Sequence, residues 1–477
     1  MMKNSNGRHG DPLQLQDPHI AVLAFPFSSH AGHLLSVVRR LASAAPSTTL
    51  FSFFNTRTSN LTLFGPTGAG VPENIKPYDV PDGVPEGYVF QGKHQEDIGL
   101  FLSAGCDGFR AAMEIAAADS GRRITCMLVD PFLWYTQEIA AEAEMHVPWV
   151  VFWTGGLASL SSHLNTDLIR EKLDVTKGIA GREDEPLSFI PGMSKMRLKD
   201  LPEGVLFGNL ESPFSNILLQ MGRAFPTAAA VAVNSFEELE PDLTQQLKSD
   251  LPNLLCIGGP MNLLNKKTSS LPSDDQYGCL AWLDARKPSP PSSPVAYISF
   301  GSVTVPRRVE LVAIAEALEV TGVPFIWSLK RESWDQNLPE GFLERTRGRG
   351  LVVPWAPQVD ILSHEAVGAF VTHCGWGSFI EGLAAGVPMI CRPFFGDQRL
   401  NGRIIQDVLE IGTVVDGGVI TRDGLVRQLG MVLAGEEGRR MRENIKGICL
   451  QARAAVEGPL GRSAVNFNKL LNIILTQ

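Results

Sequence analysis

Short apolar runs that each end in a polar or glycine-rich turn dominate the pattern of this chain. Residues 369–372 and 387–390 are two such runs, and the turns that follow them contain His373 and Gly396. Runs of this length and composition are typical of strands buried on both faces of a parallel sheet. Open parallel α/β sheets bind ligands at the carboxyl ends of their strands. The sequence therefore predicts a ligand site within residues 355–398.

Strand and helix patterns alternate along the chain in two successive sets. The first set comprises an apolar run at 20–27, a helical pattern at 30–45, and strand patterns at 48–54, 124–129, 147–153 and 230–233. The second set adds strand patterns at 295–300, 325–329 and 351–353 before the two runs above. Alternation of this kind predicts an α/β fold with two doubly wound, Rossmann-like domains facing across a cleft.

Composition marks the boundary between the two expected domains. Residues 258–277 are rich in Gly, Pro, Asn, Ser and Lys, which is typical of a linker. The first residues are polar and lack the apolar segment of a signal peptide, so we expect them to be disordered. The predicted organisation is a tail at 1–18, a first domain at 19–257, a linker at 258–278, a second domain at 279–458 and a final segment at 459–477.

Length, composition and charge exclude several classes of protein and of binding partner. At 477 residues, with 44% hydrophobic and 19% charged residues, the chain fits a soluble globular protein with two cores. A formal net charge of −9 argues against nucleic acid or an anionic membrane as partner, and no apolar run is long enough to span a membrane. Seven cysteines without a CxxC pair favour the reducing cytosol over a disulfide or zinc framework, and we expect a cytoplasmic monomer.

Residues of the predicted ligand site suit a nucleotide diphosphate sugar. Gly375 and Gly377 allow close approach of the backbone, and helical composition at 378–385 predicts a helix amino terminus facing an anion. His373 and Ser378 can donate hydrogen bonds to phosphate oxygens. Each residue alone could be a turn or core residue, but their joint arrangement favours a site. The remaining candidates are Glu381 for a ribose diol, Asp397 and Gln398 for sugar hydroxyls, Trp355 for stacking on uracil, and Ala356 and Gln358 for its edge or the ribose.

Residues 355–398 resemble the signature box of plant UDP-dependent glycosyltransferases of family 1, which have the GT-B fold. The resemblance implies UDP-glucose as co-substrate without a further cofactor, an acceptor mainly on the first domain and the donor mainly on the second. It also implies that a last helix near 463–475 crosses back to the first domain. Four further segments are similar to flavonoid 3-O-glucosyltransferases in particular: DGVPEGYVF at 82–90, FIPGMSK at 189–195, NSFEELE at 234–240 and CRPFFGDQRLNGR at 391–403.

His30 follows the first apolar run, where an imidazole at a strand-to-helix turn can face a cleft, although a lone histidine is more often structural. The resemblance implies that it is the general base. A phenolic hydroxyl with a pKa of about 10 needs such a base at neutral pH, and an imidazole with a pKa of about 6.5 is suited to the task. Asp130 follows the strand pattern at 124–129 and would fix the histidine tautomer and stabilise the imidazolium, or else only cap a helix before Phe132.

One base and a single displacement imply inversion at the anomeric carbon. The chain has no Asp-x-Asp motif, so we expect no metal, with the leaving-group charge stabilised by the helix amino terminus, His373 and Ser302. Pro131 stands where flavonoid O-glucosyltransferases often carry alanine, and the Asp-Pro-Phe triplet is also familiar from plant C-glycosyltransferases. Gly377, between Trp376 and Ser378, replaces the usual asparagine of the family, so we expect donor binding to survive with one hydrogen bond fewer.

The resemblance also assigns residues to the acceptor and to its contact with the sugar: Ser28, Gln95, Thr154, His163 and Phe207. The leading hypothesis is an inverting UDP-glucose-dependent glucosyltransferase acting on the 3-hydroxyl of flavonols or anthocyanidins. One alternative has the same fold and donor but forms a carbon–sugar bond; another is a non-catalytic flavonoid or UDP-sugar binding protein. A dehydrogenase is disfavoured because no GxGxxG follows the first strand pattern.

Overall fold

The computed structural model describes residues 17–27, 29–65, 71–91, 96–258, 275–286, 294–458 and 460–476. Residue contacts divide the chain into two compact units, the first formed by Met1–Val151 with Leu470–Gln477 and the second by Phe152–Lys469. The linker predicted at 258–278 lies mostly outside the described residues, as does the tail, and both stay predictions together with the domain boundaries. No helix in the described part of the chain is both long and apolar enough to cross a membrane.

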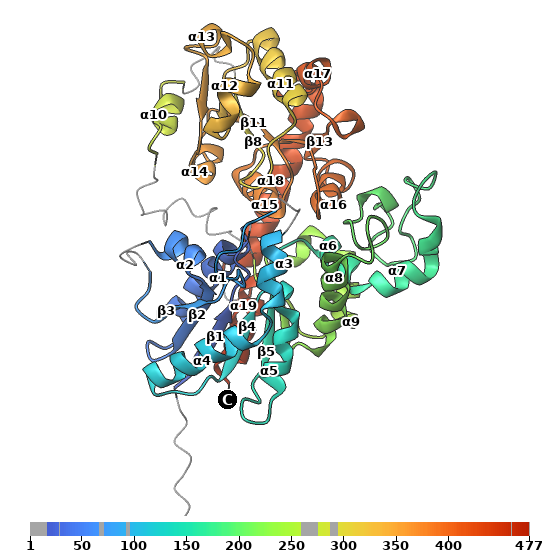
Figure 1. Ribbon diagram of the computed structural model, residues 1–477. Helices are drawn as coiled ribbons and strands as arrows, with labels where there is room; N and C mark the ends of the chain where they lie inside the picture. Colours follow the sequence, from blue (N-terminus) through green and yellow to red (C-terminus); the bar gives the residue numbers. More distant parts are fainter. Residues whose placement is uncertain are drawn as a thin grey trace, which may run out of the picture. The chain divides into compact units, whose positions relative to one another are not determined.

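The first unit is built on a parallel sheet in which the strands follow the order β3-β2-β1-β4-β5 (Figure 1). Strand β1 is buried along its whole length and pairs with β2 on one side and β4 on the other. Because the chain order reverses between β1 and β4, their carboxyl ends form a topological switch point, where open α/β sheets bind ligands. The strands are β1 (His19–Leu23), β2 (Leu50–Thr56), β3 (Ile75–Val80), β4 (Cys126–Val129) and β5 (Trp149–Trp153), the last of which continues into the second unit.

Helix α1 shows how the sequence pattern produces this unit. It buries Leu34, Val38 and Leu41, which recur three or four residues apart and therefore share one face of the helix. Helices α2 and α4 pack against β3. The helices of the unit are α1 (His30–Ala44), α2 (Arg57–Phe64), α3 (Glu96–Ser103), α4 (Asp107–Ser120), the 3₁₀ segment η1 (Pro131–Thr136) and α5 (Gln137–Ala141).

The second unit holds a six-stranded parallel sheet with the order β10-β9-β8-β11-β12-β13. This order matches that of a dinucleotide-binding doubly wound sheet, with its switch point between β8 and β11. A large core beneath it includes Trp327, Phe325, Leu318 and Leu429. The strands are β8 (Val295–Ser299), β9 (Phe325–Ser328), β10 (Gly350–Val353), β11 (Val367–Thr372), β12 (Met389–Cys391) and β13 (Gly412–Val414), while β6 (Ala230–Val233) and β7 (Leu254–Cys256) pair with each other.

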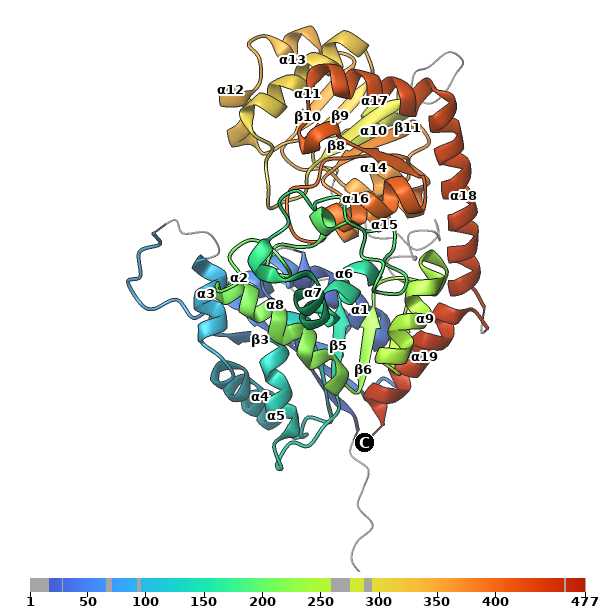
Figure 2. The same ribbon diagram turned by 90° about the vertical axis from the view of Figure 1, so that its right-hand side faces the viewer.

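Helices α11 and α17 pack against each other in the second unit, and the 21-residue α18, which follows α17 and contacts it, then extends away from it (Figure 2). The helices near the candidate site are α6 (Leu157–Leu164), α14 (Gln358–Leu362), α15 (Trp376–Ala385) and α16 (Gln398–Arg403). The other helices include α7 (Thr166–Leu173), α8 (Pro213–Ala224), α9 (Pro241–Asp250), α10 (Cys279–Asp284), α11 (Arg308–Thr321), α13 (Phe342–Arg345), α17 (Arg422–Ala434), α18 (Glu436–Val456) and α19 (Arg462–Leu475). The predicted last helix is thus present, whereas its return to the first domain stays a prediction.

Glu240 is a buried carboxyl group just before α9. Its Oε2 has no hydrogen-bond partner in the described part of the chain, and burial raises its pKa to about 8 from 4.5. Between these two values the folded protein keeps a proton that the unfolded chain releases. The contribution of Glu240 to stability therefore falls as pH rises from about 4.5 to about 8.

Replacing Glu240 with glutamine should remove this pH dependence, because the amide does not ionise. We expect the variant to unfold at a higher temperature than the parent near pH 8, with the gap narrowing near pH 5. Thermal unfolding at both pH values measures it, with Glu344→Gln on the exposed face of α13 as the control. A gap of the same size at both pH values would show that ionisation of Glu240 has no part in it.

Candidate active site

His30 and Asp130 meet at the switch point of the first unit. His30 is the first residue of α1, shortly after β1, and Asp130 directly follows β4, the strand that pairs with β1. His30 Nδ1 lies 2.8 Å from Asp130 Oδ2. The Asp130 side chain is fully buried, whereas the His30 side chain is 20% exposed. The two residues that the sequence placed 100 positions apart therefore form one hydrogen-bonded pair.

Asp130 also caps the segment that follows it. Its Oδ1 accepts a hydrogen bond of 3.1 Å from the backbone N–H of Phe132, so the two alternatives for Asp130, a cap and a partner of His30, are both realised. The Phe132 ring stacks on the His30 imidazole at 4.9 Å, and the Phe25 ring meets it edge-on at 5.4 Å. These contacts fix the plane of the imidazole.

The phosphate seat predicted for the second unit lies at the start of α15. Gly375 is the N-cap and the helix begins at Trp376, two residues before the predicted start at 378. The orphan N–H groups of the first turn thus belong to Trp376, Gly377 and Ser378. Such a terminus favours an anion. Because β11 ends at Thr372, the seat lies at the switch point beside the turn that follows β8.

His373 is held between two glycines of the site. A Cβ atom on Gly375 would come within 2.5 Å of His373 Nε2, and one on Gly301 within 2.9 Å of Cε1, so both positions must lack a side chain for the ring to fit. Burial lowers the pKa of His373 to about 4, and its Nδ1 has no partner in the described part of the chain. His373 is therefore a neutral imidazole at pH 7. Ser302, in the turn after β8, is exposed.

The Trp376 side chain points into protein. It is 4% exposed, its Nε1 donates to the Asn234 carbonyl at 2.8 Å, and a Cβ on Gly156 would lie 2.5 Å from the indole ring. Only the backbone N–H of Trp376 is thus suited to a phosphate. The sequence signature identified the residue but not this packing, because Asn234 and Gly156 lie far away in the chain.

Four polar side chains next to the predicted phosphate seat form a network. Gln358 Nε2 donates to Glu381 Oε2 at 2.7 Å and to Ser378 Oγ at 3.1 Å, and the Tyr297 hydroxyl donates to Gln358 Oε1 at 3.3 Å. Burial raises the pKa of Glu381, against the opposing effect of the bond from Gln358. Trp355, which follows β10, is 51% exposed and offers an indole face for stacking, while the adjacent Ala356 is buried.

Gln398 holds the turn that precedes it. Its Oε1 accepts hydrogen bonds from the backbone N–H groups of Phe394 at 2.8 Å and Phe395 at 3.3 Å, so the amide NH₂ is the group suited to a sugar hydroxyl. Asp397 is the N-cap residue of α16. One turn into α16, Asn401 Nδ2 donates to the Cys374 carbonyl at 2.9 Å. Asn401 was not among the predicted site residues, and nothing in its local sequence distinguishes it.

Cys374 carries backbone strain within the site. Its φ angle is +62°, a left-handed conformation that residues other than glycine seldom adopt, and it separates His373 from Gly375. Its N–H donates to Thr372 Oγ1 at 3.3 Å, and the bond from Asn401 holds its carbonyl. Surrounding hydrogen bonds thus maintain the turn that orients His373. No local sequence pattern indicates this strain.

The predicted acceptor residues are only partly described. Ser28 and Gln95 lie outside the described residues. His163 in α6 is buried, packs edge-on against Trp153 at 5.7 Å, and has an unpartnered Nδ1 among the described residues; burial lowers its pKa to about 4. Thr154 and Phe207 are half-buried.

Gly377→Asn tests the departure from the family signature. Gly377 is the second residue of α15, in right-handed helical conformation, so asparagine needs no left-handed backbone. We expect the added amide to lower the Michaelis constant for UDP-glucose by up to about tenfold, the scale of one hydrogen bond to a charged group. Steady-state kinetics measure this. A raised constant in a folded variant would show that the site uses the space at Gly377.

Among the described residues, no group of three or more His, Cys, Asp or Glu side chains is arranged to hold a metal ion.

Comparison with known proteins identifies the family. A model of the family described as UDP-glucoronosyl and UDP-glucosyl transferase matches residues 101–449. Anthocyanidin 3-O-glucosyltransferase UFGT of Vitis vinifera is 54% identical over 458 residues, which cover 96% of this chain and 97% of that protein. Flavonol 3-O-glucosyltransferase of Arabidopsis thaliana is 52% identical, with 98% of each chain covered.

A crystal structure of UDP-glucose: anthocyanidin 3-O-glucosyltransferase in complex with UDP has a TM-score of 0.87 at 42% identity, covering 96% of this chain and 99% of that one. The chain belongs to the family of UDP-glucoronosyl and UDP-glucosyl transferases. Its two parallel, doubly wound sheets confirm the predicted GT-B fold.

Proposed function

We propose that the chain is an inverting UDP-glucose-dependent glucosyltransferase that acts on flavonoids, at the 3-hydroxyl of flavonols or anthocyanidins, with His30 as the general base. The hydrogen bond of 2.8 Å between His30 Nδ1 and the buried Asp130 carboxylate carries this proposal. In this bond Nδ1 of His30 carries the hydrogen and donates it to the carboxylate. Nε2 is then unprotonated and can accept the proton of the acceptor hydroxyl. The names of the similar proteins support the acceptor class.

The proposed reaction is a single displacement. The acceptor hydroxyl loses its proton to Nε2 of His30 as its oxygen forms a bond to the anomeric carbon of glucose. The bond from that carbon to the phosphate oxygen breaks, and UDP leaves with the electron pair. The imidazolium that results is stabilised by Asp130, and the α-linked donor gives a β-glucoside.

Groups of the second unit are suited to the leaving UDP. The N–H groups of the first turn of α15 and its helix dipole favour the negative charge that develops on the diphosphate. Neutral His373 and the exposed Ser302 hydroxyl add donors. Trp355 would stack on uracil, Gln358 and Glu381 would bind the ribose, and Asp397 and Gln398 the glucose.

The buried His163 supports a polyphenol acceptor. An unpartnered Nδ1 on a neutral, buried imidazole is costly unless a ligand supplies a hydrogen-bond partner, and an acceptor hydroxyl would do so. Phe207 would provide an apolar wall and Thr154 a contact to the sugar. Ser28 and Gln95 keep their proposed acceptor roles from the family resemblance.

Incubation with UDP-glucose and a panel of flavonols, anthocyanidins, flavones and dihydrochalcones tests the proposed function. We expect flavonol and anthocyanidin monoglucosides, identified by mass spectrometry, that release the aglycone in hot acid. Products that resist hot acid would instead establish carbon–sugar bond formation. Binding of UDP-glucose without any product across the panel would identify a non-catalytic binder.

Chelation should leave transfer unchanged, because the proposed stabilisation of UDP uses N–H groups and side chains alone. The measurement is the initial rate with and without EDTA. A large loss that magnesium or manganese restores would contradict this part of the mechanism.

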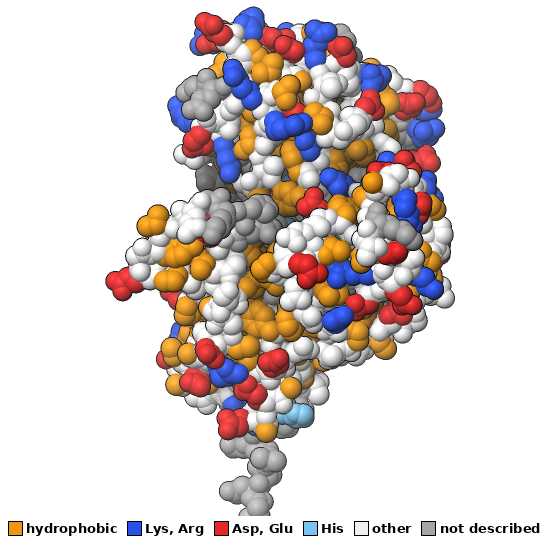
Figure 3. Space-filling model, turned by 45° about the vertical axis from the view of Figure 1, so that its right-hand side comes forward, with side chains coloured by type: hydrophobic (Ala, Val, Ile, Leu, Met, Phe, Trp, Pro, Cys, Tyr) orange, Lys and Arg blue, Asp and Glu red, His pale blue; other side chains and the backbone are white. Residues whose placement is uncertain are grey.

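A cytoplasmic monomer is the proposed state of the protein. All seven cysteines are free, which suits a reducing compartment. On the face drawn in Figure 3, basic and acidic side chains are interspersed, without the basic stripe typical of nucleic-acid binding. Light scattering of the purified protein measures the oligomeric state.

A further inference from the structure

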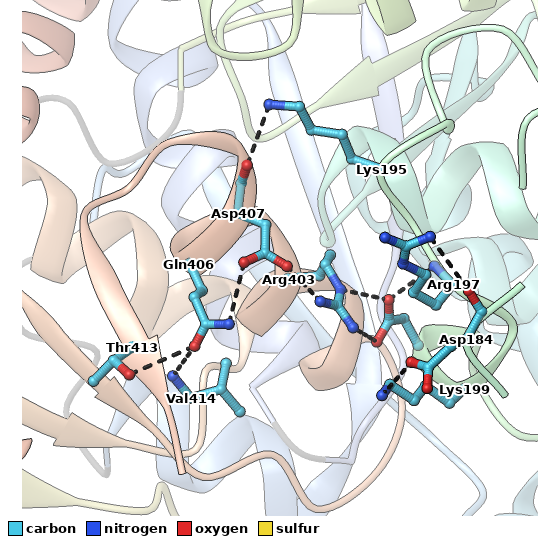
Figure 4. A network of polar contacts seen from close by, with 10 residues as sticks. Asp184, Lys195, Arg197, Lys199, Arg403, Gln406, Asp407, Thr413 and Val414 are labelled. Carbon is cyan, nitrogen blue, oxygen red and sulfur yellow. Dashed lines mark hydrogen bonds and ion pairs between the residues drawn. The ribbon is translucent and has the colours of Figure 1, made fainter. Parts of the chain in front are cut away.

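Arg403, the last residue of α16, forms a forked ion pair with a distant segment of the second unit. Its Nε donates to Asp200 Oδ2 at 2.8 Å and its Nη2 to Asp200 Oδ1 at 3.2 Å. A third arm, Nη1, pairs with Asp407 (Figure 4). Bidentate geometry of this kind fixes direction as well as distance. The pair ties the carboxyl end of α16 to the 3₁₀ turn Leu198–Asp200.

The turn that carries Asp200 is itself held in place. Asp200 Oδ2 also accepts the backbone N–H of Arg197 at 2.9 Å, and Lys195 Nζ donates to the Asp407 carbonyl at 3.2 Å. Asp200 is 5% exposed. Burial by itself lowers the pKa of Arg403, but the bonds to Asp200 and Asp407 outweigh it and raise the pKa above its ordinary value. The guanidinium therefore stays charged, and both partners are partly shielded from water.

Helix α16 carries the proposed sugar contacts at its other end. Gln398 is the first residue of this helix and Asp397 is its N-cap. Asn401, which lies between Gln398 and Arg403, donates a hydrogen bond to the Cys374 carbonyl. A cavity of about 710 Å³ is lined by Arg403 and Asp200 together with Phe394, Arg399 and Val414. One side of α16 thus borders a cavity, while Leu400 and Asn401 of the same helix are buried. The ion pair between Arg403 and Asp200 joins two residues that line this cavity.

We propose that Arg403 and Asp200 are a positioning pair for the donor sugar. They set the placement of α16 and thereby of Asp397 and Gln398, whereas UDP depends on α15 and Trp355, which the pair does not touch. This inference rests on the proposed function of the site. It predicts an effect specific to the sugar: the pair matters for transfer of glucose and for the choice between UDP-glucose and UDP-galactose, and little for the affinity of UDP.

The test uses Arg403→Gln, Asp200→Asn and the double variant in the full chain. We expect each single variant to lower kcat/KM for UDP-glucose by about tenfold or more, since small misplacements of a substrate are costly. The double variant should lose no more than the single ones, because both changes remove one interaction. The preference for UDP-glucose over UDP-galactose should fall, while the Kd of UDP, measured by calorimetry, should change less than about twofold.

Arg223→Gln is the matched control. Arg223 of α8 forms a forked pair with Asp167 of α7 at 2.8 and 2.9 Å in the same unit, and both side chains are exposed. Arg223→Gln should leave kcat/KM for UDP-glucose, the preference for UDP-glucose over UDP-galactose and the Kd of UDP unchanged. Arg403→Lys, which keeps the charge but not the fork, should fall between parent and Arg403→Gln.

Equal losses of UDP affinity and transfer, additive effects in the double variant, or an unchanged sugar preference would each overturn the positioning role. Should Arg403→Gln fail to fold, Asp200→Asn and Arg403→Lys decide by the same readouts. The proposed function has a separate test, because a parent protein that glucosylates no flavonoid would refute it. In that case the positioning role of Arg403 and Asp200 would be tested without acceptor, by comparing the affinity of parent and variants for UDP-glucose with their affinity for UDP.

Discussion

His30→Ala is expected to abolish glucosyl transfer while leaving the affinity for UDP unchanged. Without the imidazole the acceptor hydroxyl keeps its proton, and a general base contributes about 10²- to 10⁴-fold to such a step. UDP affinity should survive because the proposed diphosphate and uracil contacts come from α15 and Trp355. Single-turnover kinetics and calorimetry with UDP measure the two effects.

A second histidine of α1 provides the control. His33 lies one turn after His30 and lines a cavity of about 700 Å³ beside Phe27 and Leu63. We expect His33→Ala to retain most of the activity, because the hydrogen bond to Asp130 is made by His30 and not by His33. Transfer by His30→Ala at more than about a tenth of the parent rate would contradict its role as base.

The pH dependence of the parent adds an independent check. Burial lowers the pKa values of His33, His163 and His373 to about 4 in each case. None of these three can therefore account for a loss of rate as pH falls through the neutral range. Such a loss in kcat/KM would be assigned to protonation of the His30 imidazole. A rate independent of pH from about 5 to 8 would argue against imidazole catalysis.

Strands that are buried on both faces could be predicted from sequence because their runs are continuous and apolar. β1, β8 and β11 were found this way, within a few residues at their ends. β3 was missed since it lies at the edge of its sheet and exposed residues interrupt its buried ones, so that it has no continuous apolar run. β7 and β13, of three residues each, were missed as well.

The features of the candidate site fall into two groups, those that the local sequence suggests and those that depend on distant residues. Residue types such as His373, the glycines and Gln398 could be recognised from the signature, because local chemistry determines them. The packing of the Trp376 indole against Gly156, the fork from Arg403 to Asp200 and the strained Cys374 could not, since each depends on residues brought together only by the fold. The sequence thus supplies candidates for the donor-binding groups, whereas the contacts that hold these residues in position depend on the fold.

Asp130→Asn is expected to cut turnover by about 10²- to 10⁴-fold with little loss of stability, because it changes the protonation of His30 and keeps the shape of the side chain. Asparagine can still accept the backbone N–H of Phe132 through Oδ1, as Asp130 does at 3.1 Å. Its NH₂ then faces His30 Nδ1 and donates to it. Rotating the amide would not help, since the NH₂ would then oppose the Phe132 N–H.

With the NH₂ as donor, Nδ1 must be the unprotonated nitrogen and Nε2 carries the hydrogen, so Nε2 can no longer accept a proton from the acceptor hydroxyl. The imidazolium also loses its carboxylate. Turnover and thermal unfolding are measured together, with ¹⁵N chemical shifts of the His30 ring reporting the tautomer. Asp130→Ala, which removes the cap as well, should lose both turnover and stability. If Asp130→Asn matches the parent in rate across the pH range, Asp130 serves only as the cap of the segment that begins at Pro131.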